Sequence, residues 1–132
     1  MSSRPAMGMA GPILLIEDEP SVIAFLRAAL ERRGYAVENA SSGAEGLQRL
    51  SSGSYGGVIS DIRMPGAVNG TEVHAWIRKH RPDLSARIIL ISGDTANSDT
   101  QAFLAQSGTP CIEKPFRVQQ LISVVEKTFG KP

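Results

Sequence analysis

A short apolar segment that ends abruptly in acidic residues is the feature that most constrains the fold of this chain. Residues Ile13–Ile16 are wholly aliphatic, and Glu17-Asp18-Glu19 follow at once. Such a run is typical of a strand that is buried on both faces and whose carboxyl end reaches solvent. Pro20 then suits the first turn of a helix, and Gly34 suits its end. The pattern predicts a strand followed by a covering helix.

The same alternation of strand and helix recurs four more times. Further strands are expected at residues 35–37, 55–60, 87–91 and 111–112. The helices after them are indicated by a capping box at Ser42 and Glu45, a cap at Asn69 with Glu72, a weaker pattern over 96–105, and apolar residues at helical spacing from Val118 to Phe129. Five such units joined by right-handed crossovers predict an α/β fold with helices on both faces of a five-stranded parallel sheet. We expect the flavodoxin-like strand order 2-1-3-4-5.

Size and charge narrow the classes of function. A chain of 132 residues with 42% hydrophobic residues suits one domain, which we place at residues 12–130, after a flexible N-terminal segment at 1–11. The net charge of +1 gives no support for a nucleic acid or a membrane as partner. A single cysteine, Cys111, excludes an internal disulfide, and no apolar run is long enough to span a membrane. We therefore expect a cytoplasmic protein.

Polar side chains follow four of the expected strands. They are Glu17 and Asp18 after the first, Asp61 after the third, Ser92 after the fourth and Lys114 after the fifth. Each alone has an ordinary explanation, such as helix capping or solvation. In an open parallel sheet, however, ligands bind at this edge, where neighbouring carboxylates would repel one another. Oxygen ligands without histidine or cysteine indicate Mg²⁺, and a hydroxyl and an ammonium beside them suit phosphoryl transfer.

Taken in order, these residues resemble the receiver domain of response regulators in two-component signalling, from Pro12 to Phe129. The matching motifs are Glu17-Asp18, Asp61 with Met64-Pro65, Ser92-Gly93 and Lys114-Pro115. The resemblance implies that Asp61 accepts a phosphoryl group from a phosphohistidine of a histidine kinase or a histidine phosphotransfer protein. It also implies that Ser92 hydrogen-bonds the phosphoryl group and that Lys114 pairs with it.

The resemblance further implies a metal site and an output surface. Asp18, Asp61 and the backbone carbonyl of Arg63 would bind Mg²⁺, and Glu17 would orient metal-bound water. A downstream protein would bind the face formed by helix 4, strand 5 and helix 5. The only chemistry expected of the chain is self-catalysed phosphotransfer and autodephosphorylation.

Three departures from the family's pattern carry expectations of their own. Glu17 stands where an aspartate is frequent, and the loop over residues 61–70 is one residue longer than the common form. Cys111 stands where many receivers have a Phe or Tyr that couples phosphorylation to the output face, so this switch position is altered. Finally, Arg63 and Asp94 each lie two residues beyond a site residue, and we predict an ion pair between them across the mouth of the pocket.

Alternative functions remain open from the sequence alone. One is a constitutive interaction domain with the receiver shape; another is a mononucleotide binder or an aspartyl phosphatase, although the acidic first loop lacks a glycine-rich phosphate cradle. We expect either a stand-alone receiver or one from a larger protein such as a hybrid histidine kinase, without an output domain in this chain. His74 and His80 are expected to be solvated or partly packed rather than catalytic.

Overall fold

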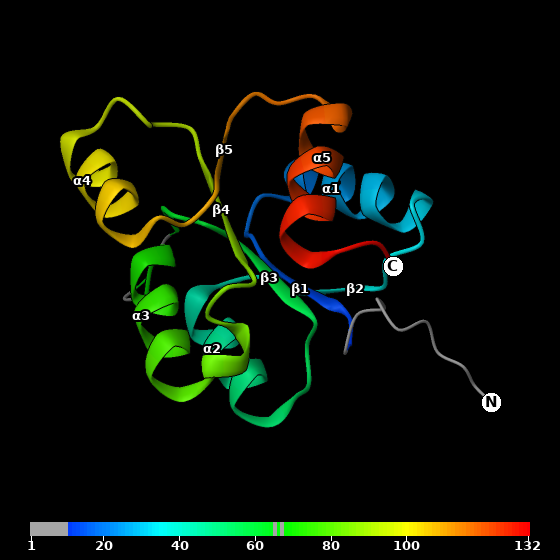
Figure 1. The fold of residues 1–132 in the computed structure, drawn as a ribbon, viewed down its shortest axis with the longest axis horizontal. Coiled ribbons are helices and arrows are strands. Elements are labelled where there is room, and N and C mark those ends of the chain that lie inside the picture. The colour runs from blue at the N-terminus through cyan, green and yellow to red at the C-terminus, as the bar shows by residue number, and fades with distance from the viewer. Residues whose placement is uncertain (1–10, 65, 67) are drawn as a thin grey trace.

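The computed structural model of the chain describes residues 11–64, 66 and 68–132 (Figure 1). Its strands are β1 (Ile13–Ile16), β2 (Val37–Ala40), β3 (Gly57–Asp61), β4 (Ile88–Ser92) and β5 (Cys111–Glu113). Its helices are α1 (Pro20–Arg32), α2 (Gly43–Ser52), α3 (Gly70–His80), the 3-10 turn η1 (Pro82–Leu84), α4 (Ser98–Ser107) and α5 (Val118–Phe129). Apart from Gly11, the expected flexible segment 1–11 lies outside the described residues.

The strands form one parallel sheet in the order β2-β1-β3-β4-β5. The α/β fold and the flavodoxin-like order expected from the sequence are therefore confirmed. Ile13 lies opposite Val37 on one side and Gly57 on the other, so β1 is an interior strand. The order reverses direction between β1 and β3, which places the ends of these two strands side by side.

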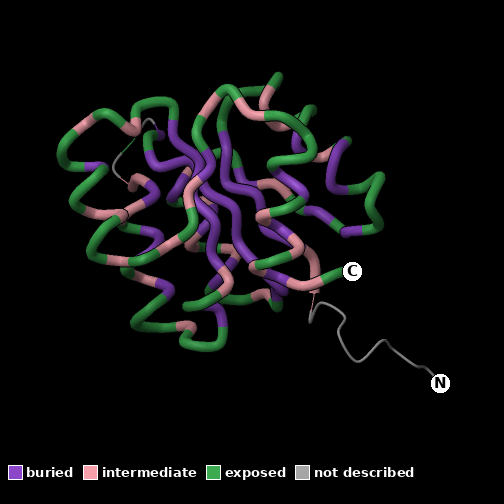
Figure 2. The backbone as a smooth tube through the Cα atoms, turned by 45° about the horizontal axis from the view of Figure 1, so that its top comes forward, coloured by how far each residue is buried: buried purple, intermediate pink, exposed green. Residues whose placement is uncertain are grey.

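Two hydrophobic layers explain why β1 is apolar at every position. Ile13 and Leu15 pack with α1 and α5, whereas Leu14 and Ile16 pack with the layer of α2 and α3 (Figure 1). All four side chains are fully buried. Figure 2 shows the buried strands at the centre of the molecule, inside a shell of more exposed helices and loops. Each such side chain contributes about 1.5–3 kcal/mol by leaving water.

Helix caps fix the loops that lead from the sheet to the helices. Asn69 and Glu72 form the full reciprocal box at the start of α3, with distances of 3.1 and 3.0 Å. At α2 the box is only half formed. The Ser42 hydroxyl accepts from the Glu45 amide at 3.1 Å, but the Glu45 carboxylate accepts from the amide and hydroxyl of Ser41 instead.

The boundaries of some elements differ from those expected. The second strand begins at Val37 rather than Tyr35, because the Tyr35 amide still donates to Leu30 at the end of α1 and its hydroxyl donates to the Gly130 carbonyl at 2.6 Å. β2 is an edge strand with Glu38 exposed, so its sequence lacks the continuous apolar pattern that predicts an interior strand. The third strand covers Gly57–Asp61 rather than 55–60, and the fourth covers Ile88–Ser92 rather than 87–91. The fifth strand covers Cys111–Glu113 rather than 111–112. The fourth helix covers Ser98–Ser107 rather than 96–105.

Candidate functional site

The candidate site lies at the carboxyl ends of the strands, where the sequence predicts it. Asp61 is the last residue of β3 and Ser92 the last of β4, while Glu17 directly follows β1 and Lys114 directly follows β5. Asp61, Glu17 and Ser92 are all buried. Parallel pairing of β1, β3, β4 and β5 brings the loops together at one edge of the sheet.

Lys114 joins two of the predicted residues directly. Its Nζ donates to Oδ2 of Asp61 at 2.7 Å and lies 3.8 Å from Oε1 of Glu17. Burial alone would lower the pKa of Lys114, but the hydrogen bond to Asp61 and the charges of Asp61 and Glu17 outweigh it, so the pKa is raised. The Lys114 side chain is therefore a charged ammonium in contact with the Asp61 carboxylate. The Lys114–Pro115 peptide bond is cis.

The backbone holds Asp61 and Lys114 in place. The Arg63 amide donates to Oδ1 of Asp61 at 3.1 Å, so each carboxylate oxygen of Asp61 has a donor. The Lys114 amide donates to the Ser92 carbonyl at 2.8 Å, which ties the loop after β5 to the end of β4. Because both contacts arise from strand pairing and a tight turn, the geometry of the carboxylate and the ammonium is fixed before any ligand binds.

Glu17 is the least satisfied carboxylate at this edge. Its side chain is 1% exposed, and Oε2 accepts from the Glu19 amide at 3.2 Å, but Oε1 has no hydrogen-bond donor among the described residues. Burial, followed by the charge of Asp61, raises the pKa of Glu17 to about 7. A buried carboxylate oxygen without a donor is costly unless a cation compensates its charge. This orphaned oxygen fits a hard cation at the site.

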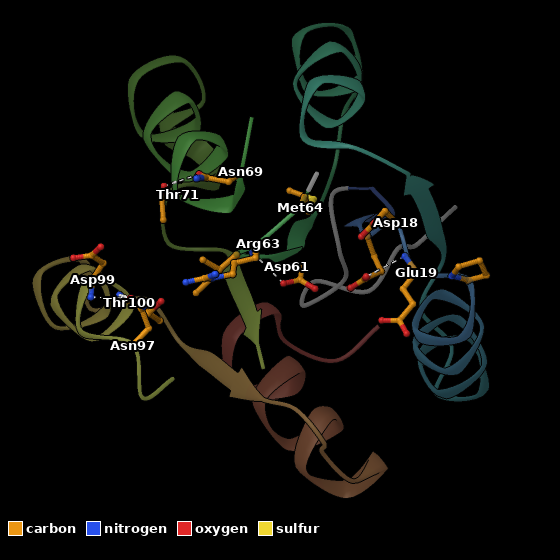
Figure 3. Close-up of a pocket in the computed structure, with 13 residues that line it drawn as sticks. Asp18, Glu19, Asp61, Arg63, Met64, Asn69, Thr71, Asn97, Asp99 and Thr100 are labelled. Atoms are coloured by element: carbon orange, nitrogen blue, oxygen red, sulfur yellow. Dashed lines mark hydrogen bonds between the residues drawn. The ribbon is translucent and has the colours of Figure 1, made fainter. Parts of the chain in front are cut away.

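Asp18 and Arg63 line an open cleft above Asp61 (Figure 3). Asp18 is exposed at its rim, and Arg63 extends toward the start of α4. Among the described residues, no group of three or more Asp, Glu, His or Cys is drawn together closely enough to hold a metal. The predicted trio of Glu17, Asp18 and Asp61 therefore borders one cleft without forming a closed cage. Mg²⁺ commonly binds through one or two carboxylates and retained waters, so this arrangement suits it.

The predicted ion pair across the mouth of the cleft is present. Arg63 and Asp94 approach to 3.5 Å, and their side chains are 65% and 49% exposed. Such exposure means that the contact adds at most about 1 kcal/mol to stability. The Ser92 hydroxyl accepts from the Asp94 amide at 3.0 Å, so Asp94 contacts both Ser92 and Arg63. The longer loop expected over 61–70 includes residues 65 and 67, which lie outside the described residues.

Cys111, at the predicted switch position, is partly buried and packs against the layer of α2 and α3. Burial, followed by the charges of Glu113 and Asp61, raises the pKa of its thiol to about 11. A thiol that stays protonated in this way is a poor nucleophile, so Cys111 behaves as a small hydrophobic residue. The neighbouring Glu113 carboxylate accepts from the Thr95 hydroxyl at 2.6 Å, which joins the loop after β4 to β5.

Sequence reasoning missed the residues that form the far wall of the cleft. They lie at the starts of α3 and α4 and are Asn69, Thr71, Asn97, Asp99 and Thr100 (Figure 3). The Asn97 side chain caps α4 by accepting from the Asp99 and Thr100 amides at 2.9 and 3.1 Å. Capping residues that begin helices after β3 and β4 must lie at the same edge as the strand ends, and this signal was available in the sequence.

Most of the chain matches a known protein family. The model of the response regulator receiver domain matches residues 13–126. The chain belongs to this family. A solved signal receiver domain of a signal transduction histidine kinase from Syntrophus aciditrophicus shares 30% identity at a TM-score of 0.80, with 91% of this chain and 90% of that one covered. The response regulator TrrA from Thermotoga maritima, solved in complex with Mg²⁺ and BeF, shares 34% identity at a TM-score of 0.77, with coverages of 89% and 98%.

Curated relatives of this receiver domain are longer proteins. The uncharacterized transcriptional regulatory protein YkoG of Bacillus subtilis is 32% identical to this chain over 113 residues. These residues are 86% of this chain and 48% of that protein. The chain thus spans about half the length of the curated relatives it matches. As a receiver domain it has a phosphoacceptor role in two-component signalling. Receiver domains bind Mg²⁺ in their active site and interact with histidine kinases. Among the described residues, no helix is both long and apolar enough to cross a membrane.

Proposed function

We propose that Asp61 is the residue of this receiver that accepts the phosphoryl group. One carboxylate oxygen of Asp61 attacks the phosphorus of a phosphohistidine, the phosphorus–nitrogen bond breaks, and its electron pair stays on the imidazole. The product is an acyl phosphate on Asp61 and a free histidine. Attack by water on the same phosphorus later releases inorganic phosphate and restores the carboxylate.

The observation that carries this proposal is the 2.7 Å contact of Lys114 with Asp61, whose carboxylate lines an open cleft. An isolated carboxylate repels an incoming phosphoryl group, whereas one with an ammonium at contact distance repels it less. Phosphoryl transfer depends mainly on position and charge neutralisation, and both are built into this contact. Lys114 then pairs with the phosphoryl oxygens, and the hydroxyl of Ser92 donates a hydrogen bond to one of them.

We further propose that Asp18, Asp61 and the carbonyl of Arg63 ligate Mg²⁺, while Glu17 orients metal-bound water. When bound, the ion would supply positive charge for both the carboxylates and the phosphoryl oxygens. The buried Oε1 of Glu17 supports this assignment. It has no hydrogen-bond donor among the described residues, and a bound cation or its water would supply the missing partner. Asp18, exposed on the rim, remains free to turn toward the ion.

The donor protein has an apolar surface available beside Lys114. Phe25 of α1 is 39% exposed, and its ring lies 5.7 Å from that of Phe116. A shallow groove joins these two rings to Val22, Pro115 and Lys114. We propose that a helix of the histidine kinase or histidine phosphotransfer protein packs here, which would bring its phosphohistidine toward Asp61.

The downstream partner is proposed to bind the face of α4, β5 and α5 and to respond to phosphorylation there. Curated relatives named transcriptional regulators raise DNA as a partner of a longer protein. The near-neutral charge of this chain gives its own residues no general affinity for nucleic acid, so we propose that any DNA contact is made elsewhere. A cytoplasmic location is likewise a proposal, consistent with a histidine kinase as phosphoryl donor.

Intact-mass spectrometry after incubation with acetyl phosphate tests this function. The native chain is expected to gain the mass of one phosphoryl group with Mg²⁺ and far less with a chelator. Asp61→Asn should gain none, and Asp18→Asn should gain it slowly even with Mg²⁺. Asp83→Asn, at an exposed aspartate of η1, is the matched control and should behave as the native chain. Equal phosphorylation of Asp61→Asn would overturn the assignment of Asp61, and a native chain that gains no phosphoryl group would favour a constitutive interaction domain.

A further inference from the structure

A buried histidine lies outside the cleft, between α3 and α4. His74 is 4% exposed, although it was expected to be solvated or partly packed. Its Nε2 lies 2.7 Å from the hydroxyl oxygen of Thr109, which precedes β5. Its ring packs edge to face against the ring of Phe103 on α4, with 5.1 Å between the ring centroids. We call His74, Phe103 and Thr109 the His74 cluster.

The His74 cluster is a large part of what attaches α4 to the molecule. Of the ten residues in α4, Thr100 is the one that is buried, and it lies in the first turn. Phe103 and Leu104 pack only partly against the hydrophobic layer. The second half of α4 is therefore held by Leu104 and by the contact of Phe103 with His74, while Thr109 fixes the segment that leaves the helix.

The charge state of His74 must affect this packing. Burial lowers the pKa of His74, and the positive charge of Arg78 one turn further along α3 lowers it more. Its contacts from α4 and from the segment before β5 are the uncharged groups of Phe103 and Thr109. Cys111, in the same hydrophobic layer, has a protonated and neutral thiol. The described surroundings therefore provide no anion to stabilise an imidazolium at this position.

We propose that the His74 cluster is a proton-sensitive attachment of α4, which holds the helix against α3 while His74 is neutral and loosens it when His74 is protonated. A histidine whose pKa falls on folding binds fewer protons in the closed arrangement than in an open one. The closed arrangement then loses stability as the pH falls below about 6.5, the ordinary value for histidine. Above that value the attachment is at full strength.

This regulation is independent of phosphorylation, although it acts on the same helix. The N-terminal residues of α4 line the cleft above Asp61, whereas the His74 cluster contacts Phe103 in the middle of the helix and Thr109 beyond its C-terminal end. Acidification would therefore loosen the second half of α4, which does not line the cleft.

Amide hydrogen exchange of the full chain, compared at about pH 7.5 and about pH 5.5, tests the proposal. After correction for intrinsic exchange, protection in α4 should fall by up to about tenfold for each pH unit below 6.5, while protection in α5 stays unchanged. His74→Gln, which cannot titrate, should remove the pH dependence. His80→Gln is the matched control, because His80 is the other histidine of the chain, lies exposed on the same helix and stacks on Trp76.

If His74→Gln folds poorly, three further results would show whether protonation of His74 loosens α4. His74→Phe keeps an aromatic ring against Phe103 and should also give pH-independent protection. In the native chain, titration of the His74 ring by NMR should place its pKa below 6.5, the ordinary value for histidine, and Arg78→Gln should raise it. A pH response of α4 that survives in a folded His74 variant, or that disappears with His80→Gln, would overturn the proposal. So would a pKa of His74 at or above 6.5.

Discussion

Helix α4 precedes β5 and helix α5 follows it, but the two helices are attached to the sheet very differently. α5 buries Leu121, Ile122, Val125 and Phe129 in the layer that it shares with α1. α4 buries Thr100 alone and depends on partial packing of Phe103 and Leu104. An element with few buried apolar contacts opens at a low free-energy cost. The comparison therefore marks α5 as a fixed support and α4 as the helix that a change at the cleft can move.

The two helices also differ in how they meet the site. Asn97 and Thr100, at the start of α4, line the cleft above Asp61. At the far end of α5, by contrast, the Arg87 side chain donates to the Phe129 carbonyl, and the Tyr35 hydroxyl donates to the carbonyl of Gly130. Helix α4 therefore begins at the cleft, whereas the C-terminal end of α5 is held by two hydrogen bonds outside the cleft.

The largest expected effect is on folding stability. Phe129→Ala should lower the free energy of unfolding by about 3–5 kcal/mol, because the ring is 2% exposed and packs against Gly57. Phe103→Ala on α4 should cost only about 1–2 kcal/mol, since its ring is partly exposed. Urea denaturation of both variants measures the difference. Equal losses would show that the two helices are equally well attached.

Removal of the ammonium at the site should separate folding from response. Lys114→Ala should fold and bind Mg²⁺, yet lose the spectral change that beryllofluoride, a mimic of the acyl phosphate, produces in α4 of the native chain. The reason is that the Lys114 ammonium pairs with the added phosphoryl charge. NMR amide shifts with Mg²⁺ alone and then with beryllofluoride provide the measurement. Lys127→Ala, at an exposed lysine of α5, is the control, and a full response in Lys114→Ala would refute the assigned role.

A subtler effect concerns how α4 responds. The small side chain of Cys111 replaces the aromatic that receivers frequently have, so α4 has less to pack against in a second position. Beryllofluoride should therefore lower hydrogen-exchange protection in α4 by several-fold without a large displacement of the helix, and it should leave α5 unchanged. Cys111→Tyr should convert the loosening into a defined shift. A large, discrete repositioning of α4 in the native chain would contradict this expectation.

The smallest effect on stability is expected at the mouth of the cleft. Replacing both Arg63 and Asp94 with alanine should move the melting temperature by no more than about 2–4 °C, because the pair is exposed. The same change should alter the rate of dephosphorylation several-fold, since the pair spans the approach of water to the acyl phosphate. A double-mutant cycle on that rate tests the coupling, and additive single effects would show that the two residues act separately.

Much of the fold was predictable because burial on both faces leaves a strong signal. The wholly apolar Ile13–Ile16 identifies an interior parallel strand without ambiguity. The edge strand β2 was expected at 35–37 but covers Val37–Ala40, because the exposed Glu38 and the half-buried Asn39 give this strand a polar middle. The weak pattern of α4 has the same cause as its loose attachment, since a helix that buries little needs few apolar residues.

The site was predictable to the extent that parallel strands place their ends together. Asp61 and Lys114 lie 53 positions apart, yet strand order alone predicted their proximity, as it did the pairing of Arg63 with Asp94. The orphaned oxygen of Glu17 could not be predicted, because it depends on which backbone amides reach the carboxylate. Nor could the contact of His74 with Thr109 be predicted, because it depends on the position of the segment after α4 relative to α3.

The most direct test of Asp61 as the phosphoacceptor is chemical mapping of the phosphoryl group. Borohydride reduces an aspartyl phosphate to homoserine, which marks its position permanently. After treatment with acetyl phosphate and Mg²⁺ and then with borohydride, peptide sequencing by mass spectrometry should find homoserine at position 61 and at no other aspartate. Homoserine at Asp18 or Asp94, or phosphorylation without any homoserine, would contradict the assignment of Asp61.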